Sequence, residues 1–331
     1  MRIWTGGLLV ILLMAHVAQA QDVSQKPQAD AVLWTDPGDI HARNLYWGVG
    51  GENHQPELPV EFVKEDKGGT NPKFDVRDSA DHKWKAKLGL EAKPETAASR
   101  LMWAVGYAAN ENYLFHELQV KNMPSSLHRG GQLVNGEKVS DVRLQRPPHD
   151  YKKKGDWNWR HNPFYGTREF NGLRIMMGLI ANWDLKDDNN AILENEKNFS
   201  PKLYEVTDVG TAFGTVGKSY TNKLSKKNLP AYQHARLIAH VHSDYIDLNF
   251  PKRPPIATLF EFQWIFFCHQ VHMGWVGKHI PRSDAKWIGS LLAQLSPDQI
   301  HDAFRAAGYS PDEIEAYSQA VLSRIRELND L

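Results

Sequence analysis

Three short segments in the first half of the chain alternate between apolar and polar residues, and only a few residues separate one segment from the next. They span 60–65, 73–77 and 84–88, and the breaks between them contain Gly68-Gly69 and the polar run 79–82. Alternation with a period of two predicts strands, and short breaks rich in Gly, Asn, Asp and Ser predict turns. The sequence therefore predicts a three-stranded antiparallel meander.

A helix and two further strands are expected after the meander. Pro94-Glu95 begins an amphipathic pattern that stops at Gly106, because proline is favoured in the first turn of a helix and glycine ends one. Strand-like runs follow at 113–120 and 139–144. We expect residues 57–150 to form a small β-rich unit.

Residues 151–281 are expected to form a larger, mainly helical unit. Its expected elements are a basic surface loop at 152–160 held by Trp157 and Trp159, a helix from near Glu169, and a strand pair around 191–193 and 203–206. The chain length, 331 residues, is enough for two such units with a sizeable core.

Two helix-start signals of the same kind stand near the end of the chain. Ser296 and Ser310 each precede a proline, and a Gln or Glu follows three residues after each serine. A capping hydroxyl, a proline at the first helical position and a Gln or Glu at the third are typical of helix N-termini. We expect two short helices separated by Gly308, in a helical hairpin that spans residues 282–331.

The amino terminus has the pattern of a secretory signal peptide. Residues 1–20 contain Arg2, an uninterrupted apolar run from Gly7 to Ala15, and a small-residue exit at Ala18-Gln19-Ala20. We expect an exported protein, periplasmic or secreted, with no membrane span after the signal is cleaved. Residues 21–56 are polar and turn-rich, and are expected to be an entry segment outside the core.

Composition excludes several classes of protein. The single cysteine, Cys268, permits no internal disulfide and no cysteine-based zinc cluster. Lys and Arg together number 39, as do Asp and Glu, so the chain lacks the net positive charge that would favour nucleic acid as a partner. Histidines recur in the last third of the chain, but without a metal-binding signature such as HExxH we expect no metal site from them. They are His234, His240, His242, His269 and His272.

Two polar segments together suggest a catalytic site. They are Asp184-Leu185-Lys186-Asp187-Asp188-Asn189 and Thr207-Asp208-Val209-Gly210. Phosphoryl transfer needs a carboxylate that orients the attacking hydroxyl, and an Asn and a second carboxylate that hold magnesium across the phosphates. Asp184, Asn189 and Asp208 supply these residue types in these two segments.

This pattern resembles the protein-kinase-like superfamily over roughly residues 58–250. Asp-Leu-Lys-x-x-Asn is similar to the catalytic loop, which places Asp184 and Lys186 at catalytic positions, and Asp-Val-Gly stands where the family has Asp-Phe-Gly. The resemblance implies a two-lobed α+β fold, with a small antiparallel β lobe and a larger helical lobe. It also implies that Asn189 and Asp208 bind Mg²⁺ and that ATP or another nucleotide donates a phosphoryl group to an unknown hydroxyl acceptor.

The resemblance implies further residues in the β-rich unit. Lys87 would hold the nucleotide phosphates, Glu95 would fix Lys87 with Glu91 as a competitor, and Gly68-Gly69 would cover the phosphates. Simpler interpretations stay open for each: a solvated strand lysine, a favourable charge at a helix N-terminus, and an ordinary hairpin turn.

The chain departs from the common protein-kinase pattern in three places. Asn182-Trp183 replaces His-Arg before Asp184, the glycine loop lacks Gly-x-Gly-x-x-Gly, and no Ala-Pro-Glu follows. The pattern is more similar to the atypical HipA-like or lipid-kinase-like branches. Two alternatives remain: a kinase-like scaffold or other exported binding module without catalysis, and a metal-dependent hydrolase that uses Asp184, Asp187 and Asp208.

Overall fold

The computed structural model describes residues 30–69, 71–198, 200–214, 228–249 and 273–331. The expected signal peptide therefore lies outside the described residues, as do Cys268, His269 and His272. Within the described residues, no helix is long and apolar enough to cross a membrane.

The β-rich unit is a small barrel. The strands are β2 (Val60–Glu65), β3 (Lys73–Arg77), β4 (Lys83–Leu88), β5 (Glu111–Lys121), β6 (Val134–Asn135) and β7 (Lys138–Arg146). They form one sheet in the order β4-β3-β2-β5-β7-β6, and β4 also pairs with β7, so that five of the strands close into a ring. The predicted meander is confirmed, because β2, β3 and β4 are successive antiparallel neighbours.

Alternation along these strands builds the core of the barrel. Phe74, Val76, Trp84, Ala86 and Leu88 alternate with polar residues and are all buried inside the ring. The two further predicted strands are also confirmed, as β5 and β7, which pair with each other over most of their length.

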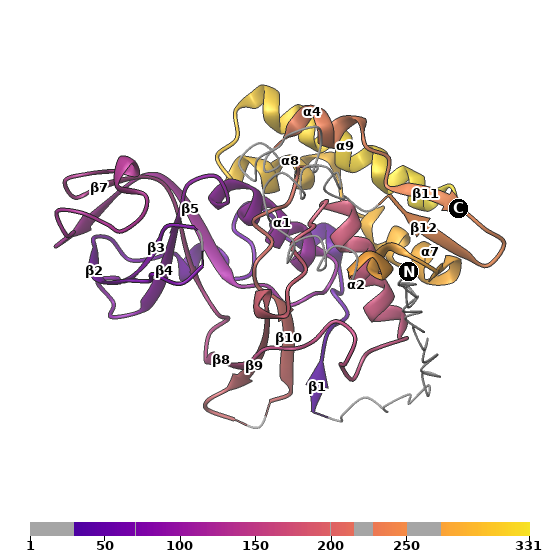
Figure 1. Ribbon diagram of the computed structural model, residues 1–331, viewed down its shortest axis with the longest axis horizontal. Helices are drawn as coiled ribbons and strands as arrows, with labels where there is room; N and C mark the ends of the chain where they lie inside the picture. The colour runs from indigo at the N-terminus through magenta and orange to yellow at the C-terminus, as the bar shows by residue number, and fades with distance from the viewer. Residues whose placement is uncertain (1–29, 70, 199, 215–227, 250–272) are drawn as a thin grey trace, which may run out of the picture.

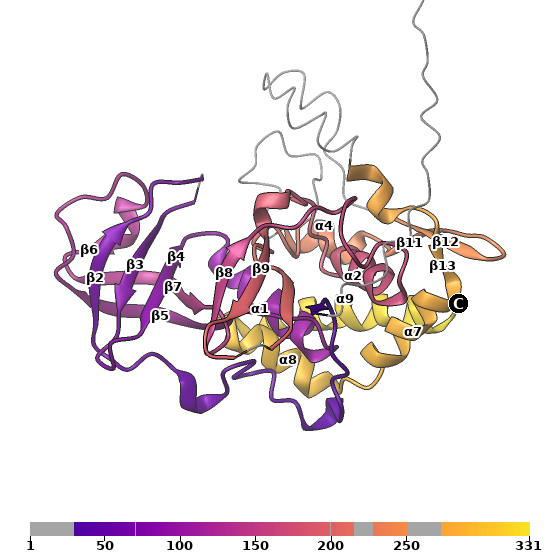
Figure 2. The same ribbon diagram turned by 90° about the horizontal axis from the view of Figure 1, so that it is seen from below.

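Helix α1 (Ala92–Ala104) lies between the barrel and the remaining helices, as Figures 1 and 2 show. It contacts β5 and β7 on one side and α8 on the other. The helix begins two residues before Pro94, and the chain leaves it through Gly106, whose φ of 99° is accessible to glycine. The predicted helix is thus confirmed with a slightly earlier start.

The strands of a second sheet lie next to the candidate catalytic residues in the sequence, because β9 begins directly after Asn189 and β10 ends two residues before Asp208. Its strands are β1 (Ala31–Val32), β8 (Tyr151–Gly155), β9 (Asn190–Asn195) and β10 (Lys202–Val206), in the order β1-β10-β9-β8. The predicted strand pair is confirmed as the antiparallel pair β9–β10. The segment 152–160, predicted to be a surface loop, begins instead in strand β8, whose basic residues are exposed. Trp157 and Trp159 are buried side by side and hold the rest of the segment, as predicted.

Residues 21–56 were expected to stay outside the core, and this expectation is wrong for their described part. Strand β1 pairs in parallel with β10, about 170 residues later in the chain. Leu33, Ile40 and Leu45 are buried in the larger hydrophobic core, together with the helices. The segment is therefore a structural part of the helical unit.

The other helices form the second, larger core. They are α2 (Arg168–Leu179), α4 (Leu229–His234), α7 (Arg282–Leu292), α8 (Pro297–Ala306) and α9 (Pro311–Asn329), with 3₁₀ turns at Ile40–Ala42, Glu52–His54, Gly131–Leu133, Asp187–Asn189 and Gly274–Gly277. The predicted helix near Glu169 is α2. A third sheet, of β11 (Ile238–Val241), β12 (Tyr245–Leu248) and β13 (Ile280–Pro281), interrupts a region that was predicted to be helical.

Both predicted capping boxes are present at the carboxyl terminus. The side-chain oxygens of Ser296 and Ser310 each accept a hydrogen bond from the N–H of the third residue of the helix that follows. The Gln299 or Glu313 side-chain oxygen in turn accepts a hydrogen bond from the serine N–H. Two details differ from the predicted hairpin. Helix α7 precedes the pair, and α9 is 19 residues long because its apolar face continues along α4 and α7.

Candidate active site

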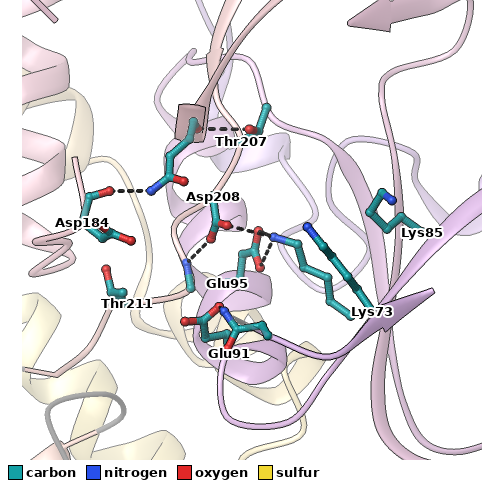
Figure 3. A network of polar contacts seen from close by, with 12 residues as sticks. Lys73, Lys85, Glu91, Glu95, Asp184, Thr207, Asp208 and Thr211 are labelled. Atoms are coloured by element: carbon teal, nitrogen blue, oxygen red, sulfur yellow. Dashed lines mark hydrogen bonds and ion pairs between the residues drawn. The ribbon is translucent and has the colours of Figure 1, made fainter. Parts of the chain in front are cut away.

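Lys87, Glu95 and Asp208 form one cluster between the barrel and the helices, in which Lys87 and Glu95 are buried and Asp208 is partly exposed. The Lys87 ammonium, at the end of β4, lies 3.0 and 3.1 Å from the two carboxylate oxygens of Glu95. Its distance to Oδ2 of Asp208 is 3.4 Å. Glu95 is in the first turn of α1 and has no exposed surface, while Lys87 is 8 % exposed. A strand lysine, a helix carboxylate and the Asp-x-Gly aspartate therefore meet, as the sequence predicts (Figure 3).

The charges in this cluster support one another. Burial alone would lower the pKa of Lys87, but the carboxylates of Asp208 and Glu95 outweigh it and raise that pKa above its ordinary value. Burial would raise the pKa of Asp208, but Lys87 and the Gly210 N–H stabilise its anion and hold that pKa below its ordinary value. Lys87 is therefore cationic and Asp208 anionic at neutral pH.

Glu95 is the most deeply buried residue of the three. Burial raises the pKa of its carboxyl, and the nearby cations Arg143 and Lys87 oppose that rise. Its ion pairs with Lys87 and Arg143 stabilise the carboxylate form.

The two motif segments are bonded to each other. The Asn189 side-chain N–H donates to the backbone carbonyl of Asp184 at 2.7 Å. The backbone N–H groups of Thr207 and Asp208 donate to the Asn189 carbonyl at 2.8 and 3.2 Å, and the Thr207 hydroxyl donates to it as well. These bonds fix the loop that follows α2 against the turn that follows β10.

Lys186 lies with Asp184 at the open side of this loop. Its ammonium is 3.0 Å from Oδ1 of Asp184, whose side chain keeps part of its surface exposed. Behind the loop, the buried Asn182 side-chain oxygen accepts a hydrogen bond from the Thr211 hydroxyl. Asn182, two residues before Asp184, therefore links the loop to Thr211, the residue after Asp-Val-Gly.

Gly68 and Gly69 lie in the turn between β2 and β3. Gly69 has a φ of 65°, and the Gly68 N–H donates to Asp66 Oδ1, as in a tight polar turn. The Arg129 guanidinium donates to the Gly69 carbonyl and ties this turn to the loop after β5. The described contacts of the two glycines are those of a hairpin turn, and a phosphate-covering role stays a prediction.

Glu91 does not compete with Glu95 for Lys87. Its carboxylate accepts a hydrogen bond from the Asn71 side chain, in the loop before β3. Its side chain packs against Gly210 so closely that a Cβ added there would lie 2.7 Å from the Glu91 Cβ. The glycine of Asp-Val-Gly is therefore required for this close approach.

Two cations that were not predicted from the sequence lie beside Lys87. Lys73 on β3 and Arg143 on β7 are the cross-strand neighbours of Lys87 in the barrel. Their side chains therefore share one face of the sheet, and Figure 3 shows Lys73 beside the cluster. An arginine in the apolar run 142–144 was the available signal for Arg143, but the strand register was needed to place it. Lys85, two residues before Lys87 on β4, does not join this group of cations. Its ammonium contacts the carboxylates of Asp66 and Asp75, at 2.8 Å each.

The structure does not assemble the metal sites of the alternative hypotheses. Among the described residues, no three His, Cys, Asp or Glu side chains are grouped so that they could hold a metal ion. Asp187 instead accepts hydrogen bonds from the Asn158 side chain and the Trp159 N–H. The hydrolase that would use Asp184, Asp187 and Asp208 together therefore has no support from the geometry.

The donors near Asp208 fit a magnesium ion that also binds phosphates. Asp208 is an anionic carboxylate, and the Asn189 amide uses its N–H for Asp184, so its oxygen can act as a ligand. Magnesium prefers oxygen ligands and commonly takes one or two from the protein and the rest from phosphates and water.

No protein family model and no curated protein match the chain. Among solved structures, the Helicobacter pylori proinflammatory kinase CtkA is similar, with 13% identity, 82% of this chain and 96% of that chain covered, and a TM-score of 0.45. The Golgi casein kinase is also similar, at 13% identity and a TM-score of 0.34, over 83% of this chain and 72% of that chain. The same enzyme with Mn/ADP bound gives 13% identity and a TM-score of 0.34, over 83% of this chain and 74% of that chain. These structural neighbours are kinases, and at such low similarity the activity of this chain must be inferred from its own site.

Proposed function

We propose that this protein is an exported, kinase-like phosphotransferase with a small β lobe and a larger helical lobe. The observation that carries the proposal is the contact of the buried Lys87 with both Glu95 and Asp208, next to the bonded pair Asp184 and Asn189. Phosphoryl transfer depends on positioning and on neutralising charge, which this set of residues can supply.

Each residue then has a distinct task. Lys87 holds the phosphates of the nucleotide, and Glu95 fixes the lysine. Asp208 and the Asn189 side-chain oxygen hold Mg²⁺, which neutralises phosphate charge when it is bound. Asp184 orients the acceptor hydroxyl and accepts its proton, while Lys186, 3.0 Å away, contributes positive charge at the transferred group.

The atypical HipA-like or lipid-kinase-like branches remain our proposal for the closest relationship. The supporting features are Asn182 before Asp184 and a β2–β3 turn with only two glycines. Export is supported by the signal-peptide pattern of residues 1–20. Mass spectrometry of the mature amino terminus, with cell fractionation, tests export: an uncleaved chain in the cytoplasm would contradict it.

The direct test of the function is nucleotide binding by residues 21–331. We expect ATP to raise the melting temperature in the presence of magnesium, because a ligand that binds the native state stabilises it. Asp208→Ala should lose this shift, since the variant lacks the carboxylate that holds the metal. Asp302→Ala is the matched control, because Asp302 lies on α8 and pairs with Arg305 on the surface.

The outcomes separate the hypotheses. An unchanged magnesium-dependent shift in Asp208→Ala would contradict the assigned metal site. No shift with any nucleotide in the wild-type protein would favour the non-catalytic binding module. If the wild-type protein binds a nucleotide, the next measurement is the transfer of labelled phosphate from that nucleotide to a hydroxyl-bearing compound.

A further inference from the structure

Arg143 places a second buried cation against the residue that fixes Lys87. Its Nη2 lies 2.7 Å from Oε1 of Glu95, the same oxygen that Lys87 contacts at 3.0 Å. Arg143 is 1 % exposed, and it faces Lys87 directly across the β4–β7 pair. Glu95 is therefore shared between two cations on neighbouring strands.

A purely structural role does not explain an arginine at this position. Like charges directly opposite each other in a sheet are destabilising, and removing charges from water is costly. The adjacent residues on β7, Val142 and Leu144, are buried and apolar. A buried ion pair can often be replaced by apolar side chains without loss of stability, so this charge calls for a functional reason.

The reason follows from the balance of charge in the cluster. The residues in direct contact are two cations, Lys87 and Arg143, and two anions, Glu95 and Asp208. The third cation nearby, Lys73, is paired with Asp66 at 3.5 Å. Glu205, another buried carboxyl nearby, adds little charge at neutral pH, because burial raises its pKa to about 8. The buried Glu91 carboxylate is bonded separately, to the Asn71 side chain. Without Arg143 the cluster would carry an excess negative charge at the place where an anionic polyphosphate must bind.

We propose that Arg143 is a positioning residue that balances the charge of Glu95, so that Lys87 remains available to the phosphates of the nucleotide. The proposal rests on the proposed function and adds a residue to it. Arg143 does not itself touch substrate in this arrangement. It acts through Glu95, which it contacts at 2.7 Å.

The experiment compares a charged and an uncharged ligand of the same site. Dissociation constants for Mg-ATP and for adenosine are measured by calorimetry on residues 21–331. For Arg143→Met we expect Mg-ATP to bind at least about tenfold more weakly and adenosine within about threefold of wild type, since only the phosphates sense the lost charge. Arg143→Lys should restore Mg-ATP affinity to within about threefold, because the positive charge returns.

Two further variants control for folding. Arg100→Met removes an equally buried arginine of α1 that donates to the Asn112 carbonyl, and it should leave both affinities within about threefold of wild type. Arg143→Gln removes the charge but keeps polar atoms for Glu95, and it replaces Arg143→Met if that protein does not fold. The same selective loss of Mg-ATP binding is expected.

The possible failures are distinguishable. A wild-type protein that binds neither ligand overturns the proposed function and this inference together. A wild-type protein that binds Mg-ATP, with Arg143→Met or Arg143→Gln binding it equally well, overturns the inference alone. Equal weakening of Mg-ATP and adenosine, or an Arg143→Lys protein as weak as Arg143→Met, shows a structural role and also overturns it.

Discussion

Glu205 is a buried acid three residues before Asp208, and it makes stability depend on pH. Burial raises the pKa of this carboxyl to about 8, and the Asn110 N–H and Arg143 oppose the rise only in part. Between pH 4.5 and about 8 the unfolded chain has lost this proton while the folded protein still holds it. The free energy of unfolding therefore falls as the pH rises through this window.

Glu205→Gln should remove this pH dependence. We expect the variant to gain stability relative to wild type between pH 6 and 9, by an amount on the order of a few kcal/mol. Urea unfolding midpoints across this range measure the effect. Glu117→Gln is the control, because Glu117 is exposed on β5. Parallel pH curves for wild type and Glu205→Gln would contradict the argument.

At the level of single residues, the sequence predicted those site residues that belong to contiguous motifs. Asp184, Asn189 and Asp208 lie close together because a few hydrogen bonds join the two motif segments. Lys73 and Arg143 were missed because only the register of three strands puts them beside Lys87. Register depends on long-range pairing, which no local pattern in this chain encodes.

Helix starts are the elements that local sequence determined best. The two capping boxes need only four consecutive residues each, and both formed as predicted. By contrast, β8 and β1 depend on partners far along the chain, β9 and β10, so their sequences alone indicated a loop and an entry segment. The short sheet β11–β12–β13 was missed for the same reason, since β13 comes from residues 280–281.

The cap of α9 gives a prediction at the level of one element. Ser310→Ala removes the hydroxyl that accepts the Glu313 N–H, and we expect it to lower the free energy of unfolding by about 1 kcal/mol. Ser323→Ala, at an exposed position within the same helix, should change stability by less than about 0.5 kcal/mol. Chemical denaturation of both variants measures the difference, and equal effects would mean that the capping box does not stabilise α9.

The carboxyl-terminal helices complete the core of the whole molecule. Phe304 on α8 and Tyr317 on α9 stack with ring centroids 5.2 Å apart, and both contact Phe213, just after Asp-Val-Gly. Arg324 on α9 donates to the carbonyls of Gly178 and Leu179, at the end of α2. The last helices therefore support the loop that carries Asp184.

Deletion of residues 296–331 should abolish cooperative folding, because it exposes this aromatic core to water. The comparison is between residues 21–295 and residues 21–331, measured by circular dichroism during thermal unfolding. We expect a sharp transition for the longer protein and none for the shorter one. A truncated protein that melts cooperatively within a few degrees of the longer one would show that α8 and α9 are dispensable.

The pairing of β4 with β7 has a consequence for how the protein behaves among other proteins. A sheet that ends in an unpaired strand offers a row of free N–H and C=O groups, to which a strand of another chain can add. In the barrel, β4, the last strand of the meander, is paired on both sides, with β3 and with β7. Strand β4, which carries Lys87, therefore cannot act as a template for fibrous aggregation.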